Sequence, residues 1–113
     1  MAQVVIASED TIRKRPELVR KVVRATLKGV RDIMTNPKGA VADYVAAVPQ
    51  HKGKEAYIEE VFGLYNTLVY PGQKTLGIID PARMAALQKF YFQQGIIPKE
   101  TPIGDLYTNE FVQ

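Results

Sequence analysis

The sequence predicts a mainly α-helical fold of four helices, one N-terminal strand and a docking C-terminal tail. The first observation is helical spacing of apolar residues along Pro16–Thr35. The second is a capping residue followed by proline, which occurs at Asn36-Pro37 and again at Asp80-Pro81 and is typical of a helix start. The third is a single short β-branched run, Gln3–Ala7, with no second run to pair with it.

The N-terminal strand is expected at Gln3–Ala7, where Val4, Val5 and Ile6 follow one another before Ser8. An isolated strand leaves backbone N–H and C=O groups unpaired along both edges, so this one needs a partner strand. Ser8 is a favourable N-cap for a brief helical turn that runs as far as Arg15.

The longest predicted helix covers Pro16–Thr35. Its apolar residues recur at steps of three and four and therefore share one face; they are Leu18, Val19, Val22, Val23, Thr26, Leu27, Val30, Ile33 and Met34. The opposite face is charged and holds Arg20, Lys21, Arg24, Lys28, Arg31 and Asp32. Proline suits the first turn, and Asn36-Pro37 ends the helix because the residue before a proline is pushed out of the α region.

Three further helices follow. One runs from Pro37 to Pro49 and a second from Glu55 to Val69, with a polar loop at 50–54 between them. After the Pro71-Gly72 turn, residues 73–79 fit no regular element, because Gly77 interrupts their apolar residues.

The last helix begins at Asp80-Pro81 and ends near Gln94, with Gly95 as the residue after its cap. The C-terminal tail, Pro102–Gln113, carries four apolar residues and is expected to dock on the helices; they are Ile103, Leu106, Tyr107 and Phe111.

Length and composition place all of residues 1–113 in one globular domain. Hydrophobic residues make up 46% and charged residues 24%, which argues against disorder. The absence of cysteine excludes disulfides and cysteine metal sites. No apolar run approaches the length of a membrane span, and the N-terminus lacks the pattern of a signal peptide. If the chain belongs to an exported protein, we expect the targeting segment to lie outside this sequence.

Positive charge is concentrated in one region. Residues 13–31 hold eight Lys/Arg against one acid, Glu17, whereas the rest of the chain holds seven against eleven. This asymmetry suits either a nucleic-acid or anionic-membrane surface or, as the favoured interpretation, a solvated face whose cations meet carboxylates elsewhere. No aromatic residue lies within the run to stack on bases, so no nucleic-acid partner is predicted.

Catalytic chemistry is not predicted. The only histidine, His51, lies in a polar loop and is interpreted as solvated. The acid pairs Glu9-Asp10 and Glu59-Glu60 are interpreted as surface charge, because adjacent helical residues point about 100° apart. No phosphate loop, nucleophile elbow or metal motif is present, so neither an enzyme, a cofactor nor a metal site is expected. The six tyrosines are assigned to packing, although Tyr70 stands beside Pro71-Gly72, where a pocket wall is plausible.

Several stretches, taken in order, resemble the last third of periplasmic solute-binding proteins of ABC importers. They are VVIASEDTIRKRPELVRKVVRATLKG, Asn36-Pro37 with Ala40, Gly95-Ile96-Ile97, and DLYTNEF near the C-terminus. The nearest group is the nitrate, sulfonate and taurine type, which shares a fold with the thiamine-pyrimidine-precursor proteins. The resemblance implies a two-lobed α/β clamshell outside the cytoplasm that delivers a small solute to a membrane permease.

Because members of that family are much longer, the chain resembles a C-terminal fragment whose strand would join a sheet built by the missing part. No ligand-binding residue can be carried over to a numbered position, so the ligand-binding residues stay unknown. The alternative is a self-associating helical interaction module, a homodimer in which Val4–Ile6 pairs across the two-fold axis. The sequence does not name the solute or the oligomeric state.

Overall fold

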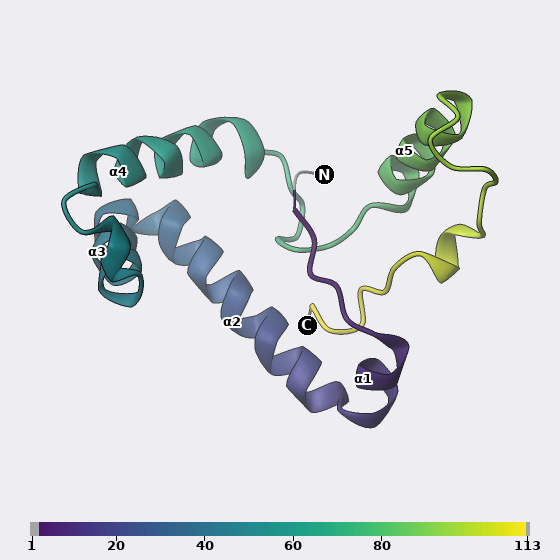
Figure 1. Cartoon of the computed structure of the whole chain (residues 1–113), viewed down its shortest axis with the longest axis horizontal. Coiled ribbons are helices and arrows are strands. Elements are labelled where there is room, and N and C mark those ends of the chain that lie inside the picture. Colours follow the sequence, from purple (N-terminus) through teal and green to yellow (C-terminus); the bar gives the residue numbers. More distant parts are fainter. Residues whose placement is uncertain (1–2, 113) are drawn as a thin grey trace. The chain divides into compact units, whose positions relative to one another are not determined.

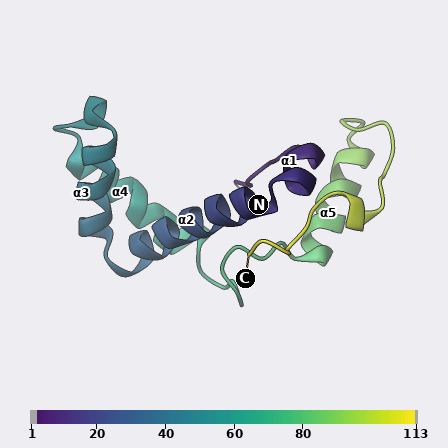
Figure 2. The ribbon, with the colours of Figure 1, turned by 90° about the horizontal axis from the view of Figure 1, so that it is seen from below.

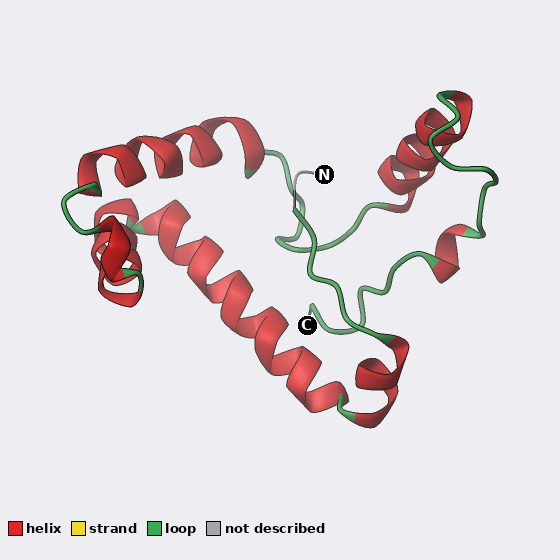
Figure 3. Ribbon diagram, in the orientation of Figure 1, coloured by secondary structure: helices red, strands yellow, loops and turns green. Residues whose placement is uncertain are grey.

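The computed structural model describes residues 3–112 and is mainly helical, with 65% of residues in helices (Figures 1 and 3). The described residues form five α-helices and divide into two compact units, Met1–Leu76 and Gly77–Gln113. The mainly α fold class is confirmed, and the assignment of residues 1–113 to one domain stays a prediction.

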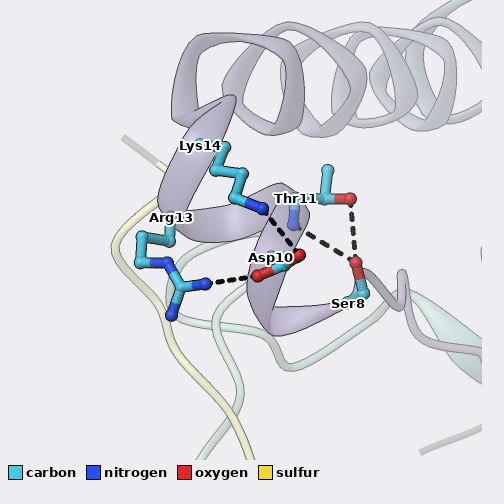
Figure 4. A network of polar contacts seen from close by, with 5 residues as sticks. All are labelled: Ser8, Asp10, Thr11, Arg13 and Lys14. Carbon is cyan, nitrogen blue, oxygen red and sulfur yellow. Dashed lines mark hydrogen bonds and ion pairs between the residues drawn. The ribbon is translucent and has the colours of Figure 1, made fainter.

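The first unit opens with α1, Glu9–Lys14, which is the brief turn expected after Ser8. The Ser8 hydroxyl accepts the Thr11 backbone N–H at 3.2 Å, as an N-cap does (Figure 4). Asp10 forms ion pairs with Arg13 and, at 2.9 Å, with Lys14, one turn further along. These contacts lie within α1 and stabilise it locally.

Helix α2 has the predicted bounds, Pro16–Thr35, and contacts α1 and α3. Asn36 ends α2 and begins α3, Pro37–Ala47, because its side-chain oxygen accepts the Gly39 N–H at 3.2 Å. Figure 2 shows α3 and α4 at the C-terminal end of α2. Helix α2 therefore ends, and α3 begins, at the predicted capping residue Asn36.

A short 3-10 turn, η1 (Pro49–His51), leads to α4, Glu55–Leu64, which packs against α3. Its last turn, η2 (Tyr65–Val69), is a π-helix, in which the Tyr70 N–H reaches the Tyr65 carbonyl at 3.0 Å. The predicted extent of this helix is thus confirmed, but its final turn is wider than an α-turn. Such widened turns recur at functional sites.

The predicted strand is not formed in this structure. Between residues 3 and 112 there is no strand, and Gln3–Ala7 is irregular backbone (Figure 3). Val4, Val5 and Ile6 are 56%, 52% and 87% exposed, and the described residues supply no backbone hydrogen bond to them. The physical reason is that a strand needs a neighbour to pair with, and no strand is formed among residues 3–112 that could pair with this segment.

The second unit contains α5, Pro81–Gln93, which begins at the predicted Asp80 cap. The Asp80 carboxylate accepts the Ala82 N–H at 2.8 Å. At the other end Gly95 has a φ of +69°, the Gly95 N–H reaches the Phe92 carbonyl and the Ile96 N–H reaches the Tyr91 carbonyl. This is the Schellman arrangement, so the prediction for Gly95 is confirmed.

The C-terminal tail docks within the second unit. Its 3-10 turn, η3 (Ile103–Asp105), contacts α5, and the Gln88 side chain bonds both the N–H and the carbonyl of Thr101 at 2.9 Å. The side chain of Asn109 makes the same two-way contact with Ile79. Residues 73–79, for which no regular element is predicted, are turns and irregular backbone.

Little of the described chain is fully buried. The buried hydrophobic residues are Val19, Val41, Ile58 and Phe111, at 5–8% exposure. Large apolar side chains remain exposed in both units, among them Leu68 at 76% and Ile96 at 62%. Within residues 3–112, no helix has the length and apolar character needed to cross a bilayer.

Candidate functional site

The candidate site is a hollow of about 260 Å³ in the first unit, between the C-terminal end of α2, α3 and the α4–η2 helix. Its wall is aliphatic and aromatic, with one amide side chain: it is formed by Gln3, Ile33, Tyr44, Ile58, Val61, Phe62, Tyr65 and Tyr70. A second hollow of about 270 Å³ adjoins it and shares Ile33, Tyr44 and Phe62. Helical periodicity brings these side chains to one face of each helix, and helix packing then brings the faces together.

Tyr44 lines both hollows and contacts two aromatic neighbours. Its ring forms a T-shaped pair with Phe62 at a centroid distance of 6.0 Å and stacks on the His51 ring at 5.5 Å. The Tyr44 hydroxyl and His51 Nδ1 are 2.9 Å apart, within hydrogen-bond distance. Tyr44 is therefore tied to two aromatic neighbours and to one hydrogen bond within the wall.

Tyr65 and Tyr70 lie at either end of the π turn, with ring centroids 5.6 Å apart. The Gln3 side-chain amide donates to the Tyr65 hydroxyl at 3.4 Å. Burial raises the pKa of Tyr70, and the neighbouring Tyr65 raises it further. Tyr70 therefore lies on a pocket wall, the place that the adjacent Pro71-Gly72 turn suggested.

The chemistry of the hollows favours an uncharged, ring-shaped occupant. None of the described residues that line the first hollow carries a formal charge, and its polar groups are hydroxyls and one amide. The second hollow has two carboxylates on its wall, Asp32 and Asp43. A small anion would meet no cation in the first hollow and repulsion in the second, whereas aromatic rings stack well on tyrosine and phenylalanine.

His51 is not solvated as the sequence suggested. It ends η1, is half-buried, and is stacked and hydrogen-bonded to Tyr44. The interpretation failed because the loop is polar in sequence, whereas the residue that covers His51 lies seven positions earlier on α3. Since its Nδ1 is engaged with Tyr44, the ring acts as a packing partner.

The acid pairs are surface charge, as predicted. Glu59 and Glu60 are exposed on α4, and Glu9 is exposed on α1 beside the ion-paired Asp10. The Gly53 N–H donates to the Glu55 carboxylate at 3.0 Å, which lowers the pKa of that carboxyl. Among residues 3–112 no three histidine or acid side chains gather where a metal ion would bind. The expected absence of metal and cofactor stays a prediction.

The cations of the basic run are exposed except for the half-buried Arg20, and three of them form ion pairs with nearby acids. Arg13 and Lys14 pair with Asp10, and Arg20 approaches Glu17 at 3.4 Å, all within one helical turn. Arg13 and Lys14 therefore meet a carboxylate outside residues 13–31, as the favoured interpretation expected. Lys21, Arg24, Lys28 and Arg31 form no ion pair with any described carboxylate.

Two comparisons with known proteins each give a match. Residues 1–40 match the sequence model of the NMT1/THI5-like family. The chain is also 28% identical, over 96% of its length, to a protein from Chloroflexus aurantiacus named riboflavin-binding protein RibY. The match covers 32% of that relative, so the chain spans about a third of the relative's length. No solved structure matches the chain.

Proposed function

We propose that this chain, which is related to the solute-binding proteins of the NMT1/THI5-like superfamily, forms part of the extracytoplasmic substrate-binding component of an ABC importer. The observation that carries the proposal is the similarity to a named riboflavin-binding protein along 96% of the chain. Binding and delivery of a solute need no bond-breaking residues.

The exposed N-terminal segment supports a role as part of a larger fold. Val4, Val5 and Ile6 have the β-branched side chains that strands favour, yet they are more than half exposed. Pairing with a sheet supplied by the remainder of a receptor would cover these side chains and their backbone groups. In this proposal the segment becomes a strand only inside a complete two-lobed α/β protein, beside its permease partner at the membrane.

The proposed solute class includes nitrate, sulfonates, taurine and pyrimidine precursors. The wall of the first hollow suits the ring-shaped members of this class better than the small anions. Four aromatic side chains and no formal charge stand on its described wall, which suits a neutral heterocycle and offers nothing to neutralise nitrate or a sulfonate. A flavin or a pyrimidine has the planar ring and the polar edge that tyrosine hydroxyls and the Gln3 amide would meet.

A graft into the Chloroflexus relative tests the proposal. The 113 residues replace the matching third of that protein, and riboflavin binding is measured by quenching of flavin fluorescence. We expect the graft to fold as a monomer and to retain riboflavin affinity within about tenfold, because a clamshell gains its affinity from two closing lobes. A graft carrying Val5→Lys is the control and should fold poorly, since a charge would enter the sheet. Aggregation of the graft that lacks Val5→Lys would overturn the proposal.

The isolated chain gives a second test. If it is part of a two-lobed receptor, it should bind nitrate, taurine, thiamine-pyrimidine precursor and riboflavin only weakly. Isothermal titration of the whole 113-residue chain measures this directly. Low-micromolar or tighter binding of any of the four would contradict the fragment interpretation, although it would agree with a solute-binding role.

The alternative function is a self-associating helical interaction module. It is favoured by the exposed apolar residues of the first unit, particularly Val4–Ile6 and, on α2, Leu18, Val22 and Met34. Two copies would bury these side chains across a two-fold axis. Sedimentation at about 100 µM should then show a dimer, whereas a monodisperse monomer that binds no 8-anilinonaphthalene-sulfonate would exclude this alternative.

A further inference from the structure

The outer face of α2 carries a row of positive charge. Lys21, Arg24, Lys28 and Arg31 follow one another at steps of three or four residues, so they share one face of the helix. All four are exposed. At 1.5 Å per residue the row is about 15 Å long. We call these four residues the basic stripe.

The basic stripe is not neutralised by the described part of the chain. The ion pairs found there engage Arg13, Lys14 and Arg20, and none engages a stripe residue. Glu17 lies before the stripe and pairs with Arg20, and Asp32 lies at its far end. Like charges at these spacings repel one another. Binding of the stripe to an anionic surface would therefore reduce the repulsion between its cations.

The stripe and the buried residues of α2 lie on different sides of the helix. The buried and half-buried residues of the helix, such as Val19, Val23 and Val30, lie on the opposite side. A partner that covers the apolar side therefore leaves the cations facing outward. Turning them inward would cost several kcal/mol per unpaired charge.

We propose that the basic stripe docks the protein on a membrane surface rich in anionic phospholipid. The stripe is a straight row on one side of a helix, so its flexible side chains can all reach a plane of phosphates at once. Nucleic acid fits less well because no aromatic side chain stands in the row to stack on bases.

Vesicle co-sedimentation with the full chain tests this proposal independently of any solute. We expect binding to vesicles that contain phosphatidylglycerol and none to pure phosphatidylcholine. Raising the salt from about 50 mM to about 500 mM should release the protein, because the Debye length shrinks severalfold. Removing three stripe cations in K21Q/R24Q/K28Q should lower the partition coefficient about 100-fold, at roughly fivefold per charge.

A matched triple variant separates the stripe from overall charge. K38Q/K54Q/K74Q removes the same charge from exposed lysines elsewhere in the first unit and should bind vesicles nearly as the parent does. Asp32→Asn should strengthen binding severalfold. Circular dichroism checks that helicity is kept, since glutamine is a good helix former.

Three results would overturn the proposal. One is an equal loss of binding in both triple variants, and another is the absence of binding to anionic vesicles at low salt. The third is tighter binding to polyglutamate or to a DNA duplex than to vesicles at equal concentration of anionic groups, because the partner would then be an acidic protein or a nucleic acid.

Discussion

The side-chain amide of Asn66 donates a hydrogen bond to the backbone carbonyl of Ile33, at 2.8 Å and 33 positions away in sequence. In a continuing helix that carbonyl would accept from residue 37, but residue 37 is proline and has no N–H. The π turn at Tyr65–Val69 thus supplies a donor that the end of α2 lacks. This one contact joins the last turn of the α4–η2 helix to α2 beside the hollow.

Replacing Asn66 with alanine should destabilise the first unit by about 1 kcal/mol, because the Ile33 carbonyl loses its donor. The cost is moderated because the buried Asn66 Oδ1 itself has no hydrogen-bond partner among the described residues. Urea unfolding measures the change. Thr67→Ala, in the same turn but exposed, is the control and should change stability by less than about 0.5 kcal/mol. Equal losses in the two variants would refute the role assigned to Asn66.

Replacing Asn109 with alanine should cost more, about 2 kcal/mol, because two contacts are lost and two backbone groups are left unpaired. Its amide accepts the Ile79 N–H at 2.9 Å and donates to the Ile79 carbonyl at 3.0 Å. Hydrogen exchange at the Ile79 amide should accelerate at least tenfold. Asn109→Asp keeps the acceptor but places a carboxylate against the Ile79 carbonyl, so it should not restore protection. Unchanged exchange in Asn109→Ala would show that the tail is held by other contacts.

Two substitutions at Tyr44 separate its hydroxyl from its ring. Tyr44→Phe loses only the hydrogen bond to His51 and should destabilise the fold by about 1 kcal/mol. Tyr44→Ala also removes the ring contacts with Phe62 and His51 and should cost about 3 kcal/mol. Tyr57→Phe, at a position 63% exposed, is the control. If Tyr44→Phe were as damaging as Tyr44→Ala in urea unfolding, the ring would not be what holds the wall.

Alkaline pH should weaken the first unit through Tyr70. Burial raises the pKa of Tyr70 above its unfolded value of 10.0, so the neutral form is favoured in the fold. The stabilisation is complete below pH 10 and is lost as the pH rises through the higher folded pKa. The phenolate absorbance at 295 nm should therefore show one tyrosine that titrates late, and Tyr70→Phe should remove that step. A late step that survives Tyr70→Phe would assign it to another tyrosine.

Local sequence accounts for most helix ends. Asn36, Asp80 and Gly95 act at the positions expected of them, because a cap bonds to backbone groups two to five residues away. The bounds of α2 follow from apolar spacing and two prolines. The resemblance to solute-binding proteins was equally readable, since it rests on the order of residues along the chain.

Other features depended on segments far apart in sequence. His51 reads as a loop residue until α3 brings Tyr44 over it, and the hollow exists only where Ile33, Phe62 and Tyr70 meet. The sequence gives one signal for the Asn66 contact, which is Pro37. Because Pro37 has no N–H, the Ile33 carbonyl needs another donor, but the sequence does not show that Asn66 provides it.

The sequence by itself determined the helices, their caps and the division of α2 into an apolar and a basic face, because these depend on contacts within a few residues. Only the tertiary structure decided that Gln3–Ala7 is irregular backbone here, that no stripe residue forms an ion pair with a described carboxylate, and that a tyrosine-walled hollow forms. Pairing of a strand, neutralisation of a cation and enclosure of a hollow each depend on a second group from a distant part of the chain. No local sequence pattern specifies that group.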